Sequence, residues 1–170
     1  NWVSVSLSST GQYQTAVVNS GQIHISSDFG VNWTARESNK QWISVSLSST
    51  GQYQTALARS SKIYISSDFG VNWTARESSR NWVSVSLSST GQYQTAVVYN
   101  GKIYRSSDFG VTWMEKDIGK YWRSVSLSST GQYQTAVGYI AKIYISSDFG
   151  ETWTANESNR NWNSISLSSS

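Results

Sequence analysis

The 170-residue chain contains no cysteine, no proline and only one histidine. Without cysteine, disulfides, thiolate metal sites and cysteine nucleophiles are excluded. A natural domain of this length ordinarily carries several prolines at its turns, so their absence indicates an unusual origin. Apolar runs reach three or four residues, as at residues 16–18, whereas a transmembrane helix needs about 20. We therefore expect no membrane partner. No signal-peptide pattern is visible, and the compartment stays open, extracellular if the protein is natural.

One segment is copied along the chain. The stretch SSDFGVNW at residues 26–33 returns, nearly unchanged, 40 residues later in each of three further copies. Units 1 to 4 are therefore residues 1–40, 41–80, 81–120 and 121–160, and residues 161–170 repeat the start of a unit. Units 1 and 2 are identical at 30 of 40 positions, and the chain holds 36 serines, as copying of one serine-rich segment predicts.

The patterns inside a unit predict strands. Val3, Val5 and Leu7 alternate with serines, which is the period-two pattern of a strand. In unit 1 we expect strands at residues 2–8, 13–18, 23–27 and 32–37, and Gly11 can take positive φ in the first turn. No segment has helical spacing. We predict one all-β domain over residues 1–170, a β-propeller of four-stranded antiparallel blades with 40 residues per blade, four blades and one extra innermost strand at 161–170.

The recurring stretch matches S-x-D-x-G-x-x-W in all four units. It resembles the Asp box of the sialidase-like Asp-box (BNR repeat) propellers, a family that mixes enzymes with binding proteins, so the resemblance implies fold more than function. We interpret the box as a lock for a hairpin: the aspartate accepts backbone N–H groups, the glycine turns left-handed and the tryptophan covers the connection. These residues are Asp28, Gly30, Trp33, Asp68, Gly70, Trp73, Asp108, Gly110, Trp113, Asp148, Gly150 and Trp153.

Enzymatic features are sparse. Sialidase chemistry, as the resemblance implies it, would need an arginine cluster and a tyrosine–glutamate pair, and no arginine lies in the family's motif near the start of the first blade. The box aspartates could be acids or metal ligands, but four equivalent carboxylates on separate blades do not form one asymmetric site. His24 is replaced by tyrosine in the other units, which indicates a surface position. We predict a protein without catalytic residues, metal or cofactor; a glycan-active enzyme of the sialidase-like group is the alternative.

Differences between the units are concentrated in two segments of the repeat. Residues 9–16 and 26–30 are the same in every unit, whereas 17–22 and 34–43 vary. In a four-stranded meander the varying connections emerge on one face, which we call the variable face. Its candidate binding residues are Arg59, Lys62, Tyr99, Lys102, Tyr121, Arg123, Tyr139 and Lys142. Basic and aromatic loop residues suit an acidic glycan or an acidic protein surface, and the charge is too sparse for specific nucleic-acid binding. The competing interpretation is drift in tolerant turns.

Residues 161–170 duplicate the innermost strand at residues 1–10, and one blade cannot use both. Either a terminus hangs free, or the spare strand completes a blade of another chain and causes self-association. The near-identity of the units indicates recent amplification or engineering, so a designed propeller without biological function is a further alternative. Asn156 is the expected glycosylation acceptor in a eukaryotic secreted protein. Our leading hypothesis is a non-enzymatic binding or scaffold and assembly module.

Overall fold

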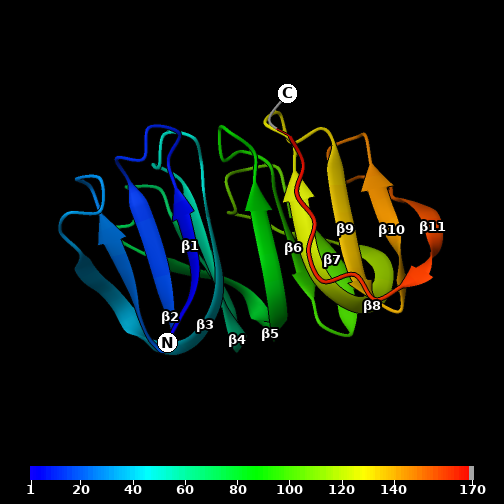
Figure 1. Ribbon diagram of the computed structural model, residues 1–170, viewed down its shortest axis with the longest axis horizontal. Coiled ribbons are helices and arrows are strands. Elements are labelled where there is room, and N and C mark those ends of the chain that lie inside the picture. The colour runs from blue at the N-terminus through cyan, green and yellow to red at the C-terminus, as the bar shows by residue number, and fades with distance from the viewer. Residues whose placement is uncertain (169–170) are drawn as a thin grey trace.

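The computed structural model describes residues 1–168, apart from the side chain of Asp117, and within that range it contains strands and no helix, hence none that could cross a membrane (Figure 1). The strands are β1 (Trp2–Leu7), β2 (Gln14–Ser26), β3 (Thr34–Leu47), β4 (Gln54–Ser66), β5 (Thr74–Leu87), β6 (Gln94–Val98), β7 (Gly101–Ser106), β8 (Met114–Leu127), β9 (Gln134–Tyr139), β10 (Ala141–Ser146) and β11 (Thr154–Arg160). Each pairs antiparallel with the next, in the order β1 to β11. The prediction of an all-β antiparallel fold is confirmed.

In units 3 and 4 the strands pair in groups of four, β5 to β8 and β8 to β11, whereas units 1 and 2 contain three strands each, β1 to β3 and β3 to β5. In unit 3, β5 pairs with β6, β6 with β7, and β7 with β8. Two expected boundaries differ in unit 1. The turn predicted at residues 19–22 lies within continuous β2, where Ser20 has φ 58°. The strand predicted at 32–37 begins at Thr34 and continues to Leu47 in unit 2, with Glu37, at φ 59°, inside a shift of register between the pairs Gly21–Lys40 and Ile23–Arg36. Strands β3, β5 and β8 thus join consecutive groups.

The core lies at the junctions between units. Trp42 is fully buried and packs in one cluster with Val17 and Ile23 of the preceding unit. The small serines of the first strand allow this close approach, and their hydroxyls accept hydrogen bonds from the next unit. The backbone N–H of Leu47, for example, donates to Ser6 Oγ at 3.1 Å. A lone unit would leave both of its faces uncovered.

The junctions repeat the same polar and aromatic contacts. The buried hydroxyl of Thr15 donates to Gln54 Oε1 of the next unit at 2.7 Å, and the ring centroid of Tyr13 lies 4.5 Å from that of Phe69. The equivalent hydrogen bonds are Thr55 to Gln94 and Thr95 to Gln134, and the equivalent ring pairs are Tyr53 with Phe109 and Tyr93 with Phe149. One set of contacts therefore serves all three internal junctions.

Residues 161–168 do not form the extra strand predicted for 161–170, and the last two residues of that prediction lie outside the described residues. The segment nevertheless occupies the place of an innermost strand beside unit 4 (red in Figure 1). The backbone N–H of Leu167 donates to Ser126 Oγ at 3.0 Å, as Leu47 donates to Ser6. It is not a strand because no described strand lies on its other side to complete the backbone ladder.

Candidate functional site

Each Asp box is a closed network of hydrogen bonds. In unit 1, Asp28 Oδ1 accepts the Ser26 hydroxyl at 2.8 Å and the Asn32 backbone N–H at 2.9 Å, and its Oδ2 accepts the Asn32 side-chain amide at 2.6 Å. The backbone N–H of Gly30, at φ 84°, donates to Ser26 Oγ at 2.9 Å. The indole of Trp33 donates to the Gly30 carbonyl at 2.9 Å. Both carboxylate oxygens are therefore used inside the turn.

The network keeps the box aspartates ionised. Hydrogen bonds from Asn32, first from its backbone, lower the pKa of Asp28. At Asp68, burial acts to raise the pKa, but hydrogen bonds from Asn72 and Ser66 outweigh it and the pKa falls below its ordinary value. The pKa of Asp108 and of Asp148 is lowered in the same way, with Thr112 and Thr152 as donors. A carboxylate held like this is a poor proton donor. Residues 1–168, as described, contain no group of three or more His, Asp or Glu side chains that could hold a metal.

The box tryptophans differ in burial according to their position in the chain. Trp73 packs against the cluster between units 1 and 2, and Trp113 and Trp153 take the same place at the later junctions. Trp33 is 40% exposed and packs against none of these clusters. Asn156, the candidate glycosylation acceptor, is exposed on β11.

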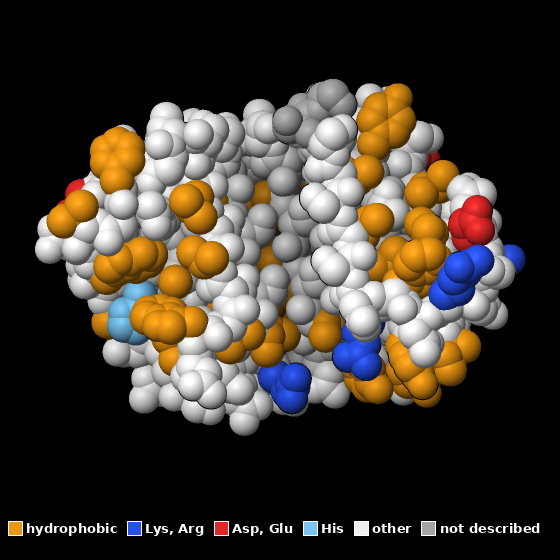
Figure 2. Space-filling view, viewed as in Figure 1, with side chains coloured by type: hydrophobic (Ala, Val, Ile, Leu, Met, Phe, Trp, Pro, Cys, Tyr) orange, Lys and Arg blue, Asp and Glu red, His pale blue; other side chains and the backbone are white. Residues whose placement is uncertain are grey.

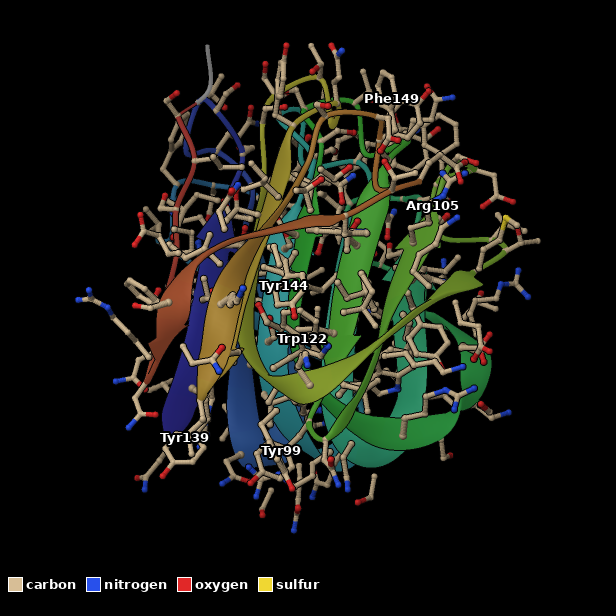
Figure 3. The ribbon with its side chains drawn as sticks, turned by 90° about the vertical axis from the view of Figure 1, so that its right-hand side faces the viewer. Tyr99, Arg105, Trp122, Tyr139, Tyr144 and Phe149 are labelled. Atoms are coloured by element: carbon tan, nitrogen blue, oxygen red, sulfur yellow. The ribbon has the colours of Figure 1, made fainter. Side chains whose placement is uncertain are left out.

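The variable face and the Asp boxes lie at opposite ends of the molecule. Figure 3 shows Tyr99 and Tyr139 at one end and Phe149, in the last Asp box, at the other. Each of these tyrosines directly precedes a turn residue with positive φ, Asn100 and Ile140. The meander therefore presents the varying connections together, away from the invariant turns.

Three of the candidate residues line one pocket. Arg59 at the middle of β4, Tyr99 after β6 and Arg123 on β8 line a pocket of about 330 Å³. Its other walls are Asn81, Trp82 and Val83 of β5. The backbone N–H of Tyr99 donates to the Asn81 carbonyl at 2.8 Å, which fixes the turn against β5. Residues from units 2, 3 and 4 thus converge at one point.

Aromatic rings continue from this pocket. The Tyr121 ring centroid lies 5.5 Å from that of Tyr99, and the Arg123 guanidinium lies 5.5 Å from the Tyr99 ring. Tyr139 stands directly opposite Tyr121 in the pairing of β8 with β9. All three tyrosines are exposed. Together with Arg59 and Arg123 they form a basic and aromatic surface, which we call the tyrosine row.

The three lysines of the predicted set do not line the pocket. Lys102 forms an ion pair with Glu115 on β8 at 3.0 Å, and Glu115 also accepts the Tyr104 hydroxyl at 3.2 Å. The hydrogen bond from Lys102 is the main cause that lowers the pKa of Glu115. Lys62 and Lys142 are exposed on β4 and β10.

Asn81, Trp82 and Val83 were not among the predicted site residues. Trp82 is 1% exposed, and its indole N–H has no hydrogen-bond partner among the described residues; the same holds for Trp42. The sequence marks these tryptophans as core positions because they recur in every unit. Nothing in the repeat shows that one of them also borders a pocket.

Comparison with known proteins identifies the repeat and the fold. Two family profiles match, the BNR-Asp box repeat at residues 103–118 and the BNR/Asp-box repeat at residues 144–155. The structure of YCF48 bound to a D1 peptide superposes with a TM-score of 0.69 at 15% identity, over 98% of this chain and 56% of that chain. The chain has a β-propeller fold with BNR/Asp-box repeats. This confirms the resemblance deduced from S-x-D-x-G-x-x-W.

Two further solved structures have a similar fold. An ancestral GH74 enzyme superposes with a TM-score of 0.75 at 16% identity, over 99% of this chain and 28% of that chain. A chain of the nidogen/laminin complex gives a TM-score of 0.75 at 10% identity, over 98% of this chain and 68% of that chain. No curated protein matches the chain in sequence. In these superpositions the chain spans little more than half of the YCF48 chain and a smaller part of the GH74 enzyme.

Proposed function

We propose that this propeller is a non-enzymatic binding and scaffold module whose tyrosine row receives an acidic peptide segment. The observation that carries the proposal is the convergence of Arg59, Tyr99 and Arg123 on one pocket from three different units. Within the described residues, neither arginine forms an ion pair. Two unneutralised guanidinium groups beside exposed aromatic rings favour a ligand that carries carboxylates.

The geometry suits an extended chain. The row from Tyr99 through Tyr121 to Tyr139 offers flat apolar surface, and rigid tyrosines supply contact area at low entropic cost. The structure of YCF48 bound to a D1 peptide supports peptide binding by a propeller of this fold.

The scaffold part of the proposal concerns the blades. Each unit of 40 residues is one four-stranded blade, so the chain supplies four blades and one additional inner segment at residues 161–168. Among residues 1–168 the pairing order ends at β11 without returning to β1, and the chain spans 56% of the YCF48 chain. Both observations support a ring of blades that the described residues leave open. Self-association through residues 161–170 follows from this and is developed in the next subsection.

The carboxylates favour binding over catalysis. A glycoside hydrolase needs a general acid whose pKa is raised by its surroundings. Among the carboxyl groups that the structure describes, each whose pKa departs from its ordinary value departs downwards, and the glutamates among them are paired with cations, Glu77 with Arg80 and Glu115 with Lys102. The glycan-active alternative, supported by the similarity to a GH74 enzyme, lacks a candidate acid among these groups.

The test is binding of a fluorescent glutamate-rich peptide, followed by anisotropy. Arg123→Ala and Arg59→Ala should each weaken binding about tenfold, since a hydrogen bond to a charged group contributes roughly 1.5 kcal/mol. Lys62→Ala is the matched control, because it removes an exposed cation outside the pocket. Equal weakening by all three variants would show unspecific charge attraction and refute the site. Stronger binding of a sialylated glycan than of the peptide would refute the ligand class, and turnover of a glycoside panel would favour the enzyme.

A further inference from the structure

The first unit has an open apolar face. Trp2 is 64% exposed, whereas its equivalent Trp42 is fully buried at the junction between units 1 and 2. Phe29 is also 64% exposed, whereas its equivalent Phe69 stacks on Tyr13. Hydrophobic side chains gather over β1 and β2 at one side of Figure 2, around a cavity of about 620 Å³ lined by Trp2, Val5, His24 and Trp33. Such a large apolar patch marks an interaction surface.

The fourth unit has the opposite half of the same junction. Tyr133 is 54% exposed, although its equivalent Tyr93 stacks on Phe149 of the next unit. Ile145 is exposed, although its equivalent Ile65 lines the junction pocket with Val111. The described contacts give Thr135 no glutamine to donate to, whereas Thr95 donates to Gln134 at 2.6 Å. A cavity of about 590 Å³ lies here, lined in part by Tyr133, Thr135, Ile145 and Leu167.

Each group missing from one open face is present on the other. In the register of the internal junctions, Thr135 would donate to Gln14, Tyr133 would stack on Phe29, and Ile145 would pack on Val31. We propose that a second copy of this chain docks its unit 1 on unit 4 of the first copy, and its unit 4 on unit 1, to close a dimeric ring of eight blades. The inference stands apart from the proposed acidic ligand, since none of these residues lines the Arg59 pocket.

The arrangement of the two ends supports a closed dimer. In Figure 1, β1 and residues 161–168 both face the viewer while β4 lies behind them, and Figure 2 shows the surface hollowed between the two halves. A two-fold axis in front of the molecule would therefore bring both open faces into contact with one partner. Two identical junctions form at once, as closed symmetry requires.

Residues 161–168 continue the chain from unit 4 into this junction. Strands β3, β5 and β8 each run from the outer strand of one blade to the inner strand of the next. The segment continues β11 in the same way, and its contacts with Ser124 and Ser126 are those of an inner strand. It matches residues 1–8 at six of eight positions. It would pair with residues 14–18 of the second copy in place of that copy's β1, so one antiparallel ladder replaces an equal one, and Trp162, whose indole donates to the Ala141 carbonyl at 3.0 Å, takes the place of Trp2 at the junction.

The junction between units 3 and 4 differs from the other internal junctions in its charged residues. Arg105 stands where units 1, 2 and 4 have isoleucine, and Glu151 stands where units 1 to 3 have valine. The Arg105 guanidinium hydrogen-bonds the Glu151 carboxylate, which also pairs with Lys116 at 2.6 Å. Unit 3 therefore requires an acidic residue on the following unit. Unit 4 presents Ile145 instead, which fits the Val31 of unit 1, itself 76% exposed.

Light scattering after size exclusion tests the assembly. The chain should give twice its mass of 18.9 kDa. Deletion of residues 161–170 should yield the mass of a single chain, and deletion of residues 1–10 should keep the dimer, because β1 is the strand displaced. A single-chain mass for the intact protein at its highest soluble concentration overturns the proposal, and a ladder of larger masses overturns ring closure. The reverse result for the two deletions overturns strand exchange.

A charge swap tests the docked register. Ile145→Arg and Val31→Glu should each give a monomer, since both junctions of a homodimer then contain an unpaired charge. Mixed in equal amounts, the two chains should form a dimer, in which one junction carries an arginine–glutamate pair like Arg105–Glu151 and the other keeps isoleucine against valine. Recovery of the dimer requires both variants to be folded. A mixture that stays monomeric, while circular dichroism shows both chains folded, refutes the register.

Discussion

The packing at a junction can be tested at a glycine whose neighbours in the sequence are identical in every unit. Gly11 and Gly51 both follow Ser-Ser-Thr and have φ of 76° and 80°. A β-carbon at Gly11 would meet nothing within 4 Å, whereas at Gly51 it would lie 2.6 Å from Tyr13 Cβ of the preceding unit. Substitution by alanine therefore imposes the same left-handed backbone at both sites but a steric clash at only one.

The expected losses in the free energy of unfolding differ between the two glycines. The left-handed conformation costs alanine about 1–2 kcal/mol at either position. The Gly51→Ala clash adds about 1–3 kcal/mol, because Tyr13 Cβ is held by its backbone and cannot swing away. The reduced entropy of the unfolded chain is common to both variants and cancels in the comparison. Gly51→Ala should thus be less stable than Gly11→Ala by about 1–3 kcal/mol, or about 2–4 °C in Tm per kcal/mol.

Urea denaturation monitored by tryptophan fluorescence is the assay. Both substitutions are made in the Ile145→Arg chain, so that no second copy covers Gly11. The urea midpoint should fall further for Gly51→Ala, with the same m-value in both variants. Equal midpoints would refute the close approach of Tyr13 to the turn, and with it the packing that every junction shares.

Two further outcomes follow from the hydrogen bonds. The Asp-box carboxylates have a lowered pKa in the folded chain, so their contribution to stability is present above the unfolded pKa of about 3.9 and is lost as pH falls through the folded values. The Tm should therefore be flat near neutrality and drop below about pH 4, and the drop should be less steep in Asp68→Asn. An unchanged dependence of Tm on acid pH in that variant would contradict the role of the box. Thr95→Val should lower the free energy of unfolding by about 1–3 kcal/mol, because it leaves Gln134 Oε1 buried without its donor. The matched control is Thr135→Val in the monomeric Ile145→Arg chain, where the described contacts give Thr135 no glutamine acceptor. Equal losses of stability in the two variants would show that the threonine–glutamine hydrogen bond is not the cause.

The sequence predicted the parts of the fold that repeat. The 40-residue period, the alternation of Val5 and Leu7 with serines, and the Asp-box signature are local patterns, and local patterns decide strands, turns and blade type. Strand boundaries were less predictable. The irregularity around Glu37 shifts the register of pairing without ending the strand, so β3 passes through the position where the unit boundary predicted an interruption.

The candidate site was predictable only in part. Differences between units identified Arg59, Tyr99 and Arg123, because a meander groups its varying turns on one face. The pocket wall at Trp82 was not predictable, since a repeated tryptophan signals core in every unit alike. Arg105 and Glu151 were missed for a different reason. They lie in different units, and only the packing of unit 3 on unit 4 brings the two side chains together.

That one ionic junction bears on how a chain of near-identical blades selects its order. Junctions with the same Thr–Gln and Tyr–Phe contacts are interchangeable, so any blade could in principle follow any other. A second copy that displaced unit 4 and docked its unit 1 after unit 3 would place Val31 against Arg105, which is 7% exposed, and would bury a guanidinium without its carboxylate. Breaking a fully buried pair costs about 3–5 kcal/mol, and the cost here is smaller because the Glu151 side chain is 46% exposed. Docking after unit 4 buries no such charge, because Ile145 meets Val31. The Arg105–Glu151 pair therefore directs a second copy to unit 4 of the first. This selectivity depends on the penalty for docking after unit 3 more than on any added attraction at unit 4.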